Sequence, residues 1–212
     1  NFNGQIKGEH SIAMKRGVGS GLLDQVESKK IVLKAGSLSA DKTITIGNAK
    51  WQAVQGPVTK STTWNEGSRI HVTSNLTVAK SATLIIKQGC VIKLAPKTEV
   101  TVLGKLIVEG TKETPVVFCP ETPDAPWGGI TLKGSAASAE ASWAFVTGSG
   151  GNSWWFVANN VPGTHRNEQA AFFLGEGAKG AFADCFFIDN AGQAFHGESA
   201  QLTLDRCVVQ RC

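Results

Sequence analysis

The chain has 212 residues, of which 42% are hydrophobic and 18% are charged, and its formal net charge is +4. This composition supports a folded domain and excludes a disordered chain. No apolar run approaches the roughly 18 residues of a membrane-spanning helix, so the chain is not expected to cross a membrane. The mild, dispersed positive charge argues against nucleic-acid binding. Because apolar residues form no long stripes at helical spacing, a helical bundle is excluded as well.

Residues 1–60 are the least regular part of the sequence and form a separate N-terminal segment. Leu22, Leu23 and Val26 follow Ser20 at helical spacing, which predicts a short helix that could cap the rest of the chain. Strands are expected at 30–33 and 43–46, the second of which alternates Thr and Ile.

Residues 61–212 consist of very short apolar strands separated by small or polar turns. Examples are 84–86, 100–102 and 106–108, with a turn such as Ala79–Ala82 between two strands. Strands of three or four residues cannot form a sandwich of long hairpins. They are typical of a coil that bends every few residues.

An internal repeat near the end of the sequence indicates what this coil is. When the chain is shifted by 22 residues, 172–190 align with 194–212. The identical pairs are Phe173/Phe195, Gly175/Gly197, Glu176/Glu198, Ala178/Ala200 and Cys185/Cys207. A fixed repeat is typical of stacked architectures, and three short strands in 22 residues make one rung of a parallel β-helix.

The preceding rung contains additional residues. Segments 133–135 and 143–146 align with 174–176 and 184–187 at an offset of 41 residues, which is one rung and 19 further residues. We place the surplus in a loop, 151–169, that leaves the coil between two rungs. A loop of this length is uncommon unless it is functional or disordered.

Several segments between residues 63 and 150 carry a family resemblance. They are Asn75–Lys93, Gly104–Thr111, Thr114–Phe118 and Pro126–Ile130. This part of the chain resembles the right-handed parallel β-helix proteins of the pectin-lyase-like superfamily, in particular the repeat modules of secreted and surface-attached bacterial proteins. The resemblance implies an all-β, right-handed parallel β-helix and export to the cell surface or beyond. It does not fix the activity, because the same scaffold in that superfamily serves polysaccharide lyases, glycoside hydrolases, adhesins and spacers.

The loop at 151–169 is the first candidate site, because it gathers aromatic, amide and basic side chains. The residues are Trp154, Trp155, Phe156, Asn159, Asn160, His165 and Arg166. Flat aromatic faces stack on sugar rings, and aromatic residues and Arg also anchor protein interfaces. We therefore expect the loop to bind carbohydrate or a protein partner. The alternative is a lid whose aromatic rings fold back onto the coil.

Acidic residues near the last rungs provide weaker candidates for catalysis. Glu176 and Glu198 would stand one rung apart, as a general acid/base pair requires, or could share a Ca²⁺ ion. The glycines around them favour a turn in which both carboxylates are solvated.

Asp184, Asp205 and Arg206 form the other weak catalytic set. They alternate with apolar residues, which places them on the outer face, beside Asp189 and Arg211. The resemblance implies Ca²⁺-binding Asp and a basic Arg in the groove of the family's lyases, and these residues have the right types. The alternative is a surface lattice of salt bridges, which stabilises little.

The five cysteines are Cys90, Cys119, Cys185, Cys207 and Cys212. They include no C-x-x-C pair and no His at ligand spacing, so no metal site and no cofactor is expected apart from the possible Ca²⁺. We expect buried thiols that act as small apolar side chains, with their pairing left open.

Cys212 aligns with Asn190, so the sequence stops inside a rung without a capping turn. The rest of a longer polypeptide or another subunit is expected to stack on that rung. These features predict an exported, non-catalytic β-helical scaffold or binding module, such as an adhesin, that presents the 151–169 loop. The alternatives are a carbohydrate-active enzyme, either a polysaccharide lyase or a glycoside hydrolase, and a structural subunit that assembles end to end.

Overall fold

The computed structural model describes residues 30–35, 37–43 and 50–212, and the chain divides into two compact units, 1–50 and 51–212. In the first unit, β1 (Lys30–Ala35) pairs antiparallel with β2 (Leu38–Thr43). The strand expected at 30–33 is therefore present as β1. The helix expected after Ser20 lies outside the described residues, and so does nearly all of the strand expected at 43–46.

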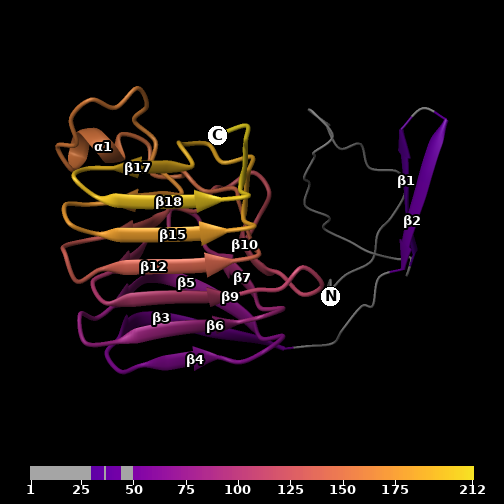
Figure 1. The fold of residues 1–212 in the computed structure, drawn as a ribbon, viewed down its shortest axis with the longest axis horizontal. Helices are drawn as coiled ribbons and strands as arrows, with labels where there is room; N and C mark the ends of the chain where they lie inside the picture. The colour runs from indigo at the N-terminus through magenta and orange to yellow at the C-terminus, as the bar shows by residue number, and fades with distance from the viewer. Residues whose placement is uncertain (1–29, 36, 44–49) are drawn as a thin grey trace. The chain divides into compact units, whose positions relative to one another are not determined.

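The second unit is a parallel β-helix, whose stacked strands are seen in Figure 1. Wall 1 consists of β4 (Thr62–Trp64), β6 (Thr83–Lys87), β9 (Lys105–Glu109), β12 (Ser138–Ser142), β15 (Lys179–Ala183) and β18 (Gln201–Asp205). Wall 2 runs from the first half of β5 (Arg69–Val78) through β7 (Val91–Leu94), β10 (Val116–Pro120), β13 (Ala144–Thr147), β16 (Phe186–Ile188) and β19 (Val208–Gln210). Wall 3 runs from the second half of β5 through β8 (Val100–Val102), β11 (Ile130–Leu132), β14 (Phe172–Leu174) and β17 (Phe195–Gly197).

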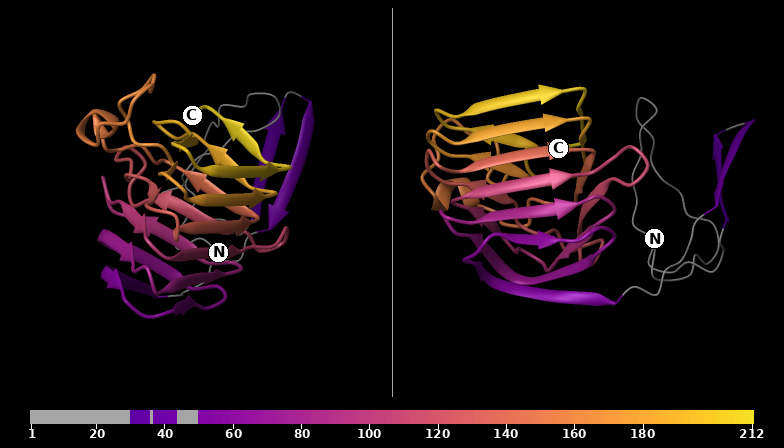
Figure 2. Two further views of the ribbon diagram at one scale, coloured as in Figure 1. Left: turned by 60° about the vertical axis from the view of Figure 1, so that its left-hand side comes forward. Right: turned by 60° about the horizontal axis from the view of Figure 1, so that its bottom comes forward.

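Each rung passes through walls 1, 2 and 3 in turn, and each strand pairs in parallel with the equivalent strand of the next rung. The views in Figure 2 show the strands of wall 1 lying one above another. The predicted all-β parallel β-helix is therefore confirmed. The coil begins at β3 (Trp51–Val58), which pairs with β5, so the division that we predicted after residue 60 moves to residue 50.

Alternation of apolar and polar residues forms these strands, because successive side chains of a strand point to opposite faces. In β9, Leu106 and Val108 are buried, whereas Lys105 and Glu109 are exposed. The repeat places each inward residue above an inward residue of the rung before it. A single continuous core therefore runs along the axis of the coil.

Phenylalanine rings fill that core in the last rungs. Phe172 lies 4.8 Å from Phe182 and 6.0 Å from Phe187, and Phe195 lies 4.4 Å from Phe187, measured between ring centroids. Most of these contacts are edge-on, the arrangement that aromatic rings prefer.

The last three corners between walls 1 and 2 share one backbone geometry. Trp143, Asp184 and Arg206 occupy equivalent corner positions on successive rungs, and their φ angles are 49°, 54° and 50°. This left-handed conformation costs roughly 1 kcal/mol or more for residues other than Gly and is easiest for Asn and Asp. The stacking of whole rungs therefore holds the Trp and Arg corners in a geometry that they would not adopt alone.

The predicted repeat needs one correction, in wall 3. Walls 1 and 2 keep the offset of 22 residues, since Lys179 pairs with Gln201 and Phe186 with Val208. In wall 3 the offset is 23, so Phe172, rather than Phe173, pairs with Phe195. The reason is the turn between walls 3 and 1, which is one residue shorter in the last rung, after β17, than after β14. The same slip removes the predicted pairing of Gly175 with Gly197.

Neighbouring phenylalanines on β16 test this assignment of inner and outer faces. Phe187 is completely buried, so Phe187→Ala should lower the free energy of unfolding by about 3–5 kcal/mol. Phe186 points outward and stacks on Phe145, so Phe186→Ala should lose mainly the stacking energy of about 0.5–1.5 kcal/mol. Urea denaturation followed by circular dichroism measures both values. Equal losses for the two variants would contradict the assigned register.

Candidate functional site

The 151–169 loop lies between β13 and β14 and carries the short helix α1 (Trp155–Ala158). Its two ends meet where the backbone N–H of Gln169 donates to the carbonyl oxygen of Asn152 at 3.1 Å. The Asn152 amide also donates to Oε1 of Gln169 at 2.7 Å. In Figure 1 the loop stands beside β17, outside wall 3. Because its ends are joined, the loop can leave the coil without disturbing the rungs on either side.

Two of the predicted binding residues anchor the loop instead of facing solvent. Trp155 and Phe156 are 6% and 1% exposed. The Trp155 ring lies 5.0 Å from the ring of Phe173, and Phe156 lies 4.9 Å from His196. For these two rings the alternative interpretation, folding back onto the coil, is the one observed. They pack on outward-facing side chains of β14 and β17.

His196 therefore has a different environment from the one that the repeat suggested. Our alignment placed it above Leu174, whereas in the structure it pairs with Phe173 and stacks on that ring at 5.8 Å. The one-residue slip of wall 3 is the cause. Nδ1 of His196 lies 3.0 Å from Oε1 of Gln193. Because Phe156 packs against this imidazole, His196 is one of the residues on which the loop rests.

A partly buried polar network completes the anchor, and the sequence analysis missed it. Nε1 of Trp155 donates to Oε2 of Glu99 at 2.8 Å, and the Gln169 amide donates to the same oxygen at 3.0 Å. Thr101 donates to the other carboxylate oxygen at 3.0 Å, and Gln169 also donates to Thr131. Hydrogen bonds to a charged group are worth about 1.5–3 kcal/mol each. The β-period places Glu99 on the outer face, but its partners lie 56 and 70 residues away in sequence, so no local pattern reveals them.

The remaining loop residues of the predicted set face solvent. Trp154 is 64% exposed and has a φ angle of 62°, and Val157 on the next turn is 61% exposed. The other members, Asn159, Asn160, His165 and Arg166, are also exposed. The amide of Asn159 is already used, since it donates to the carbonyl oxygen of Trp155 at 2.8 Å. The structure thus divides the predicted set into a buried anchor and an exposed surface around Trp154.

The second predicted set, Asp184, Asp205 and Arg206, is brought together as ion pairs. The guanidinium of Arg206 forms a fork on Asp184, with distances of 2.7 Å from Nε and 2.8 Å from Nη2, and also contacts Asp205. The hydrogen bonds from Arg206 lower the pKa of Asp184, and this carboxylate in turn raises the pKa of Arg206. Asp189 and Arg211 form an equivalent fork one corner further along. This arrangement matches the alternative interpretation, a surface lattice of salt bridges.

The third predicted set, Glu176 and Glu198, lies at the turn where the register slips. Glu176 is exposed and Glu198 is half-buried, and no hydrogen bond joins their side chains in the described part of the chain. Within residues 30–35, 37–43 and 50–212, no group of three His, Cys, Asp or Glu side chains is arranged to hold a metal ion. No helix among these residues is long and apolar enough to cross a membrane.

All five cysteines are free thiols. Burial raises the pKa of Cys119 to about 11 and that of Cys185 to about 12. Both thiols therefore remain protonated at neutral pH, where they are poor nucleophiles and poor metal ligands. They act as the small apolar side chains that the sequence suggested.

Removal of the Glu99 carboxylate should loosen the loop while leaving the coil folded. Glu99→Ala deletes the acceptor for Trp155 and Gln169, so trypsin should cut after the exposed Arg166 about tenfold faster. Mass spectrometry of timed digests measures this rate. Glu109→Ala, which deletes only the exposed partner of Lys87, is the matched control and should leave the rate unchanged. An unchanged rate in Glu99→Ala would show that the network does not hold the loop.

The fork between Asp184 and Arg206 should stabilise the fold in a defined pH range. Because the folded-state pKa of Asp184 is lowered, its contribution is present above the ordinary Asp pKa of about 3.9 and disappears as the pH falls through the lowered value. Wild type should therefore have a higher urea midpoint than Arg206→Ala at pH 7. The difference should vanish near pH 2. Arg166→Ala serves as a control, and a difference from wild type that does not depend on pH would contradict this explanation.

Comparisons with known proteins give one match. Residues 56–152 match the family model described as a pectate-lyase-like β-helix domain, which confirms the resemblance seen in the sequence. Comparisons with curated proteins and with solved structures found no match. The matched segment covers β-strands of all three walls, and the same coil continues beyond the 151–169 loop to β19. Over residues 56–152 the chain is therefore similar to a pectate-lyase-like β-helix domain.

Proposed function

We propose that this chain is a non-catalytic β-helical binding module whose 151–169 loop presents Trp154 to a carbohydrate or a protein partner. The observation that carries this proposal is the contrast between adjacent residues. Trp154 is 64% exposed, whereas Trp155 and Phe156, which follow it directly, are almost completely buried. An exposed tryptophan is held in place by two buried neighbours.

Preorganisation gives the exposed ring its value for binding. The anchor fixes α1 on wall 3, and the left-handed backbone at Trp154 directs the side chain away from its buried neighbours. A ligand that stacks on this ring therefore does not have to order the loop, which would otherwise reduce its affinity. Trp is also the residue type most enriched among side chains that dominate binding energy.

The neighbouring side chains support a ligand with both apolar and polar groups. Val157 on α1 adds a second exposed apolar side chain, and Asn160, His165 and Arg166 supply exposed donors in the same loop. A sugar ring has one apolar face and a rim of hydroxyl groups, so it fits this combination. A protein segment with an apolar anchor and a polar rim fits it too. Export to the cell surface or the medium, implied by the family resemblance, is part of the proposal.

The ion pairs of the acidic residues support a non-catalytic role. A general base must be free to take a proton, and a carboxylate whose pKa is lowered by a bidentate arginine is a weak base. Asp184 is such a carboxylate, and the guanidinium of Arg206 is occupied by the same two hydrogen bonds. The predicted catalytic set therefore serves the corners of the coil.

A glycan array probed with the labelled chain, wild type and Trp154→Ala, tests the carbohydrate partner. Loss of the Trp154 ring should weaken retention by about tenfold or more, because it removes the central contact. To test a protein partner, both chains carry a photoreactive residue at position 157. The yield of the cross-linked complex should fall in Trp154→Ala by the same factor as the retention on glycans.

Trp51→Ala is the matched control, since Trp51 is a partly exposed tryptophan on β3 that packs under Lys93 instead of in the loop. It should retain the ligand. Retention that is unchanged in Trp154→Ala, or lost equally in Trp51→Ala, would contradict the proposed role of the loop.

A further inference from the structure

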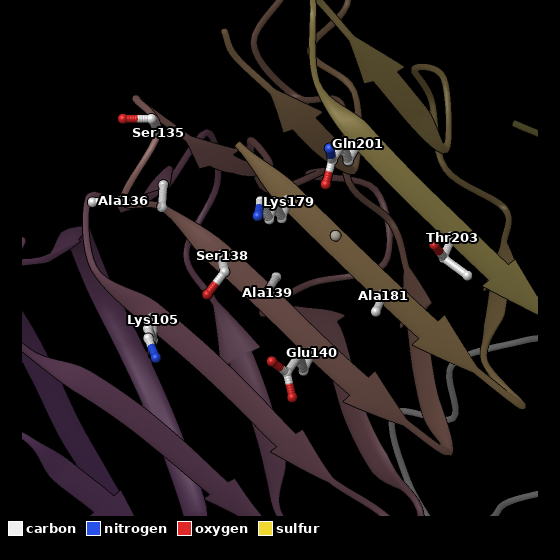
Figure 3. Close-up of a pocket in the computed structure, with 12 residues that line it drawn as sticks. Lys105, Ser135, Ala136, Ser138, Ala139, Glu140, Lys179, Ala181, Gln201 and Thr203 are labelled. Atoms are coloured by element: carbon white, nitrogen blue, oxygen red, sulfur yellow. The ribbon is translucent and has the colours of Figure 1, made fainter. Parts of the chain in front are cut away.

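An open hollow of about 450 Å³ lies on the outer face of wall 1, away from the loop residues discussed above. Figure 3 shows side chains from β9, β12, β15 and β18 around it. The polar residues that line it include Lys105, Ser138, Glu140, Lys179, Gln201 and Thr203. The hollow exists because small residues alternate with long ones: Ser138 lies between the two lysines, and Ala181 lies between Glu140 and Thr203.

The polar side chains around this hollow are uncommitted. None of the six forms a hydrogen bond or an ion pair with another side chain in the described part of the chain. Some charged groups elsewhere on the coil are paired, since Lys87 pairs with Glu109 and Arg206 with Asp184. The hollow is therefore a place where the coil keeps hydrogen-bonding groups available.

The two lysines have a defined separation. Lys105 pairs with Ser138, and Ser138 pairs with Lys179, so the lysines occupy the same column two strands apart. Neighbouring strands are about 4.8 Å apart, which places the two backbone positions about 10 Å from each other. A peptide in the extended polyproline II conformation has three residues per turn and advances about 3.1 Å per residue, so its residues i and i+3 lie on one face about 9 Å apart.

We propose that this hollow binds an acidic peptide segment of a protein partner in the extended polyproline II conformation, with acidic residues at positions i and i+3 contacting Lys105 and Lys179. The segment runs across the strands, along the stack. Ser138, Gln201 and Thr203 offer side-chain hydrogen bonds to its backbone, and the main chains of β12 and β15 are already paired on both sides. Glu140, in the neighbouring column, disfavours a third acidic residue there and so restricts which acidic segments fit.

The lining favours a peptide over a glycan. No aromatic side chain lines the hollow, so a sugar ring would find no flat face on which to stack. The exposed Trp154 offers such a face, but it belongs to the loop. This inference is independent of the proposed function of the loop, because the two surfaces share no residue.

Fluorescence polarisation with a labelled peptide tests the site on the full chain. The probe is Gly-Ser-Asp-Thr-Ser-Asp-Ser-Gly, and its control carries Asn in place of both Asp residues. The acidic probe should bind at least fivefold more tightly than the control, and high salt should reduce that difference, as expected for exposed charge pairs. No binding of the acidic probe at about 1 mM chain, or equal binding of both peptides, would overturn the proposal.

Variants separate the site from general charge effects. Lys105→Ala with Lys179→Ala should weaken binding of the probe at least fivefold. Lys60→Ala with Lys112→Ala removes the same charge from exposed turns outside the hollow and should leave binding unchanged. Ala181→Gln keeps both lysines but fills the hollow, and it should also weaken binding.

Equal binding by wild type and the variants of the hollow would overturn the proposal, as would an equal loss in the Lys60 and Lys112 control. Binding of a hexagalacturonate probe that depends on Lys105 and Lys179, without binding of the peptide, would identify a glycan surface and overturn it as well. Trp154→Ala leaves the hollow intact and should bind the peptide normally. Failure of the loop proposal and failure of this one are therefore distinguishable.

Discussion

The constraint on which the rest of this structure depends is the parallel, in-register stacking of the rungs. Each strand donates and accepts its backbone hydrogen bonds with the rungs before and after it, so equivalent residues lie about 4.8 Å apart along each column. An inward polar residue without a partner, or an outward pair of like charges, would be destabilising. The inward columns are accordingly filled by Leu, Ile, Val and Phe, and continuous packing along the axis replaces the layered core of most domains.

The same stacking explains how the corners carry charge. Asp184 and Asp189 occupy left-handed corner positions, and the arginine above each one, Arg206 or Arg211, forms a fork on it. Because a repeat stacks equivalent residues, identical charged residues at a corner would place like charges next to each other. Here the charges on successive rungs are opposite, so they form ion pairs. These residues resemble a catalytic set in sequence because alternation places them together on the outer face. In the folded chain, their ion pairs join successive corners of the coil.

Much of the fold can be predicted from the sequence because it depends on local sequence patterns. Strand alternation and the repeat of 22 residues identify the coil, its inward columns and the loop at 151–169. The slip at β17 could not be found in this way, since the Phe173/Phe195 and Gly175/Gly197 identities favour an offset that the shorter turn before β18 breaks. The anchor of the loop was also hidden. Glu99 is an outward strand residue like many others, and only the folded chain brings it to Trp155.

The division between coil and loop also separates the packing that stabilises the fold from the exposed surface on which the proposed function depends. The stacked rungs supply the packing that keeps the coil folded. Residues on the outer face of the coil are therefore free to vary, provided that they do not interrupt the backbone pairing. In the loop, the rings of Trp155 and Phe156 pack on wall 3, whereas the ring of Trp154 is exposed to solvent. In the hollow, the short residues Ser138 and Ala181 lie between longer side chains of the neighbouring strands. Both surfaces therefore arise from small departures from the repeat.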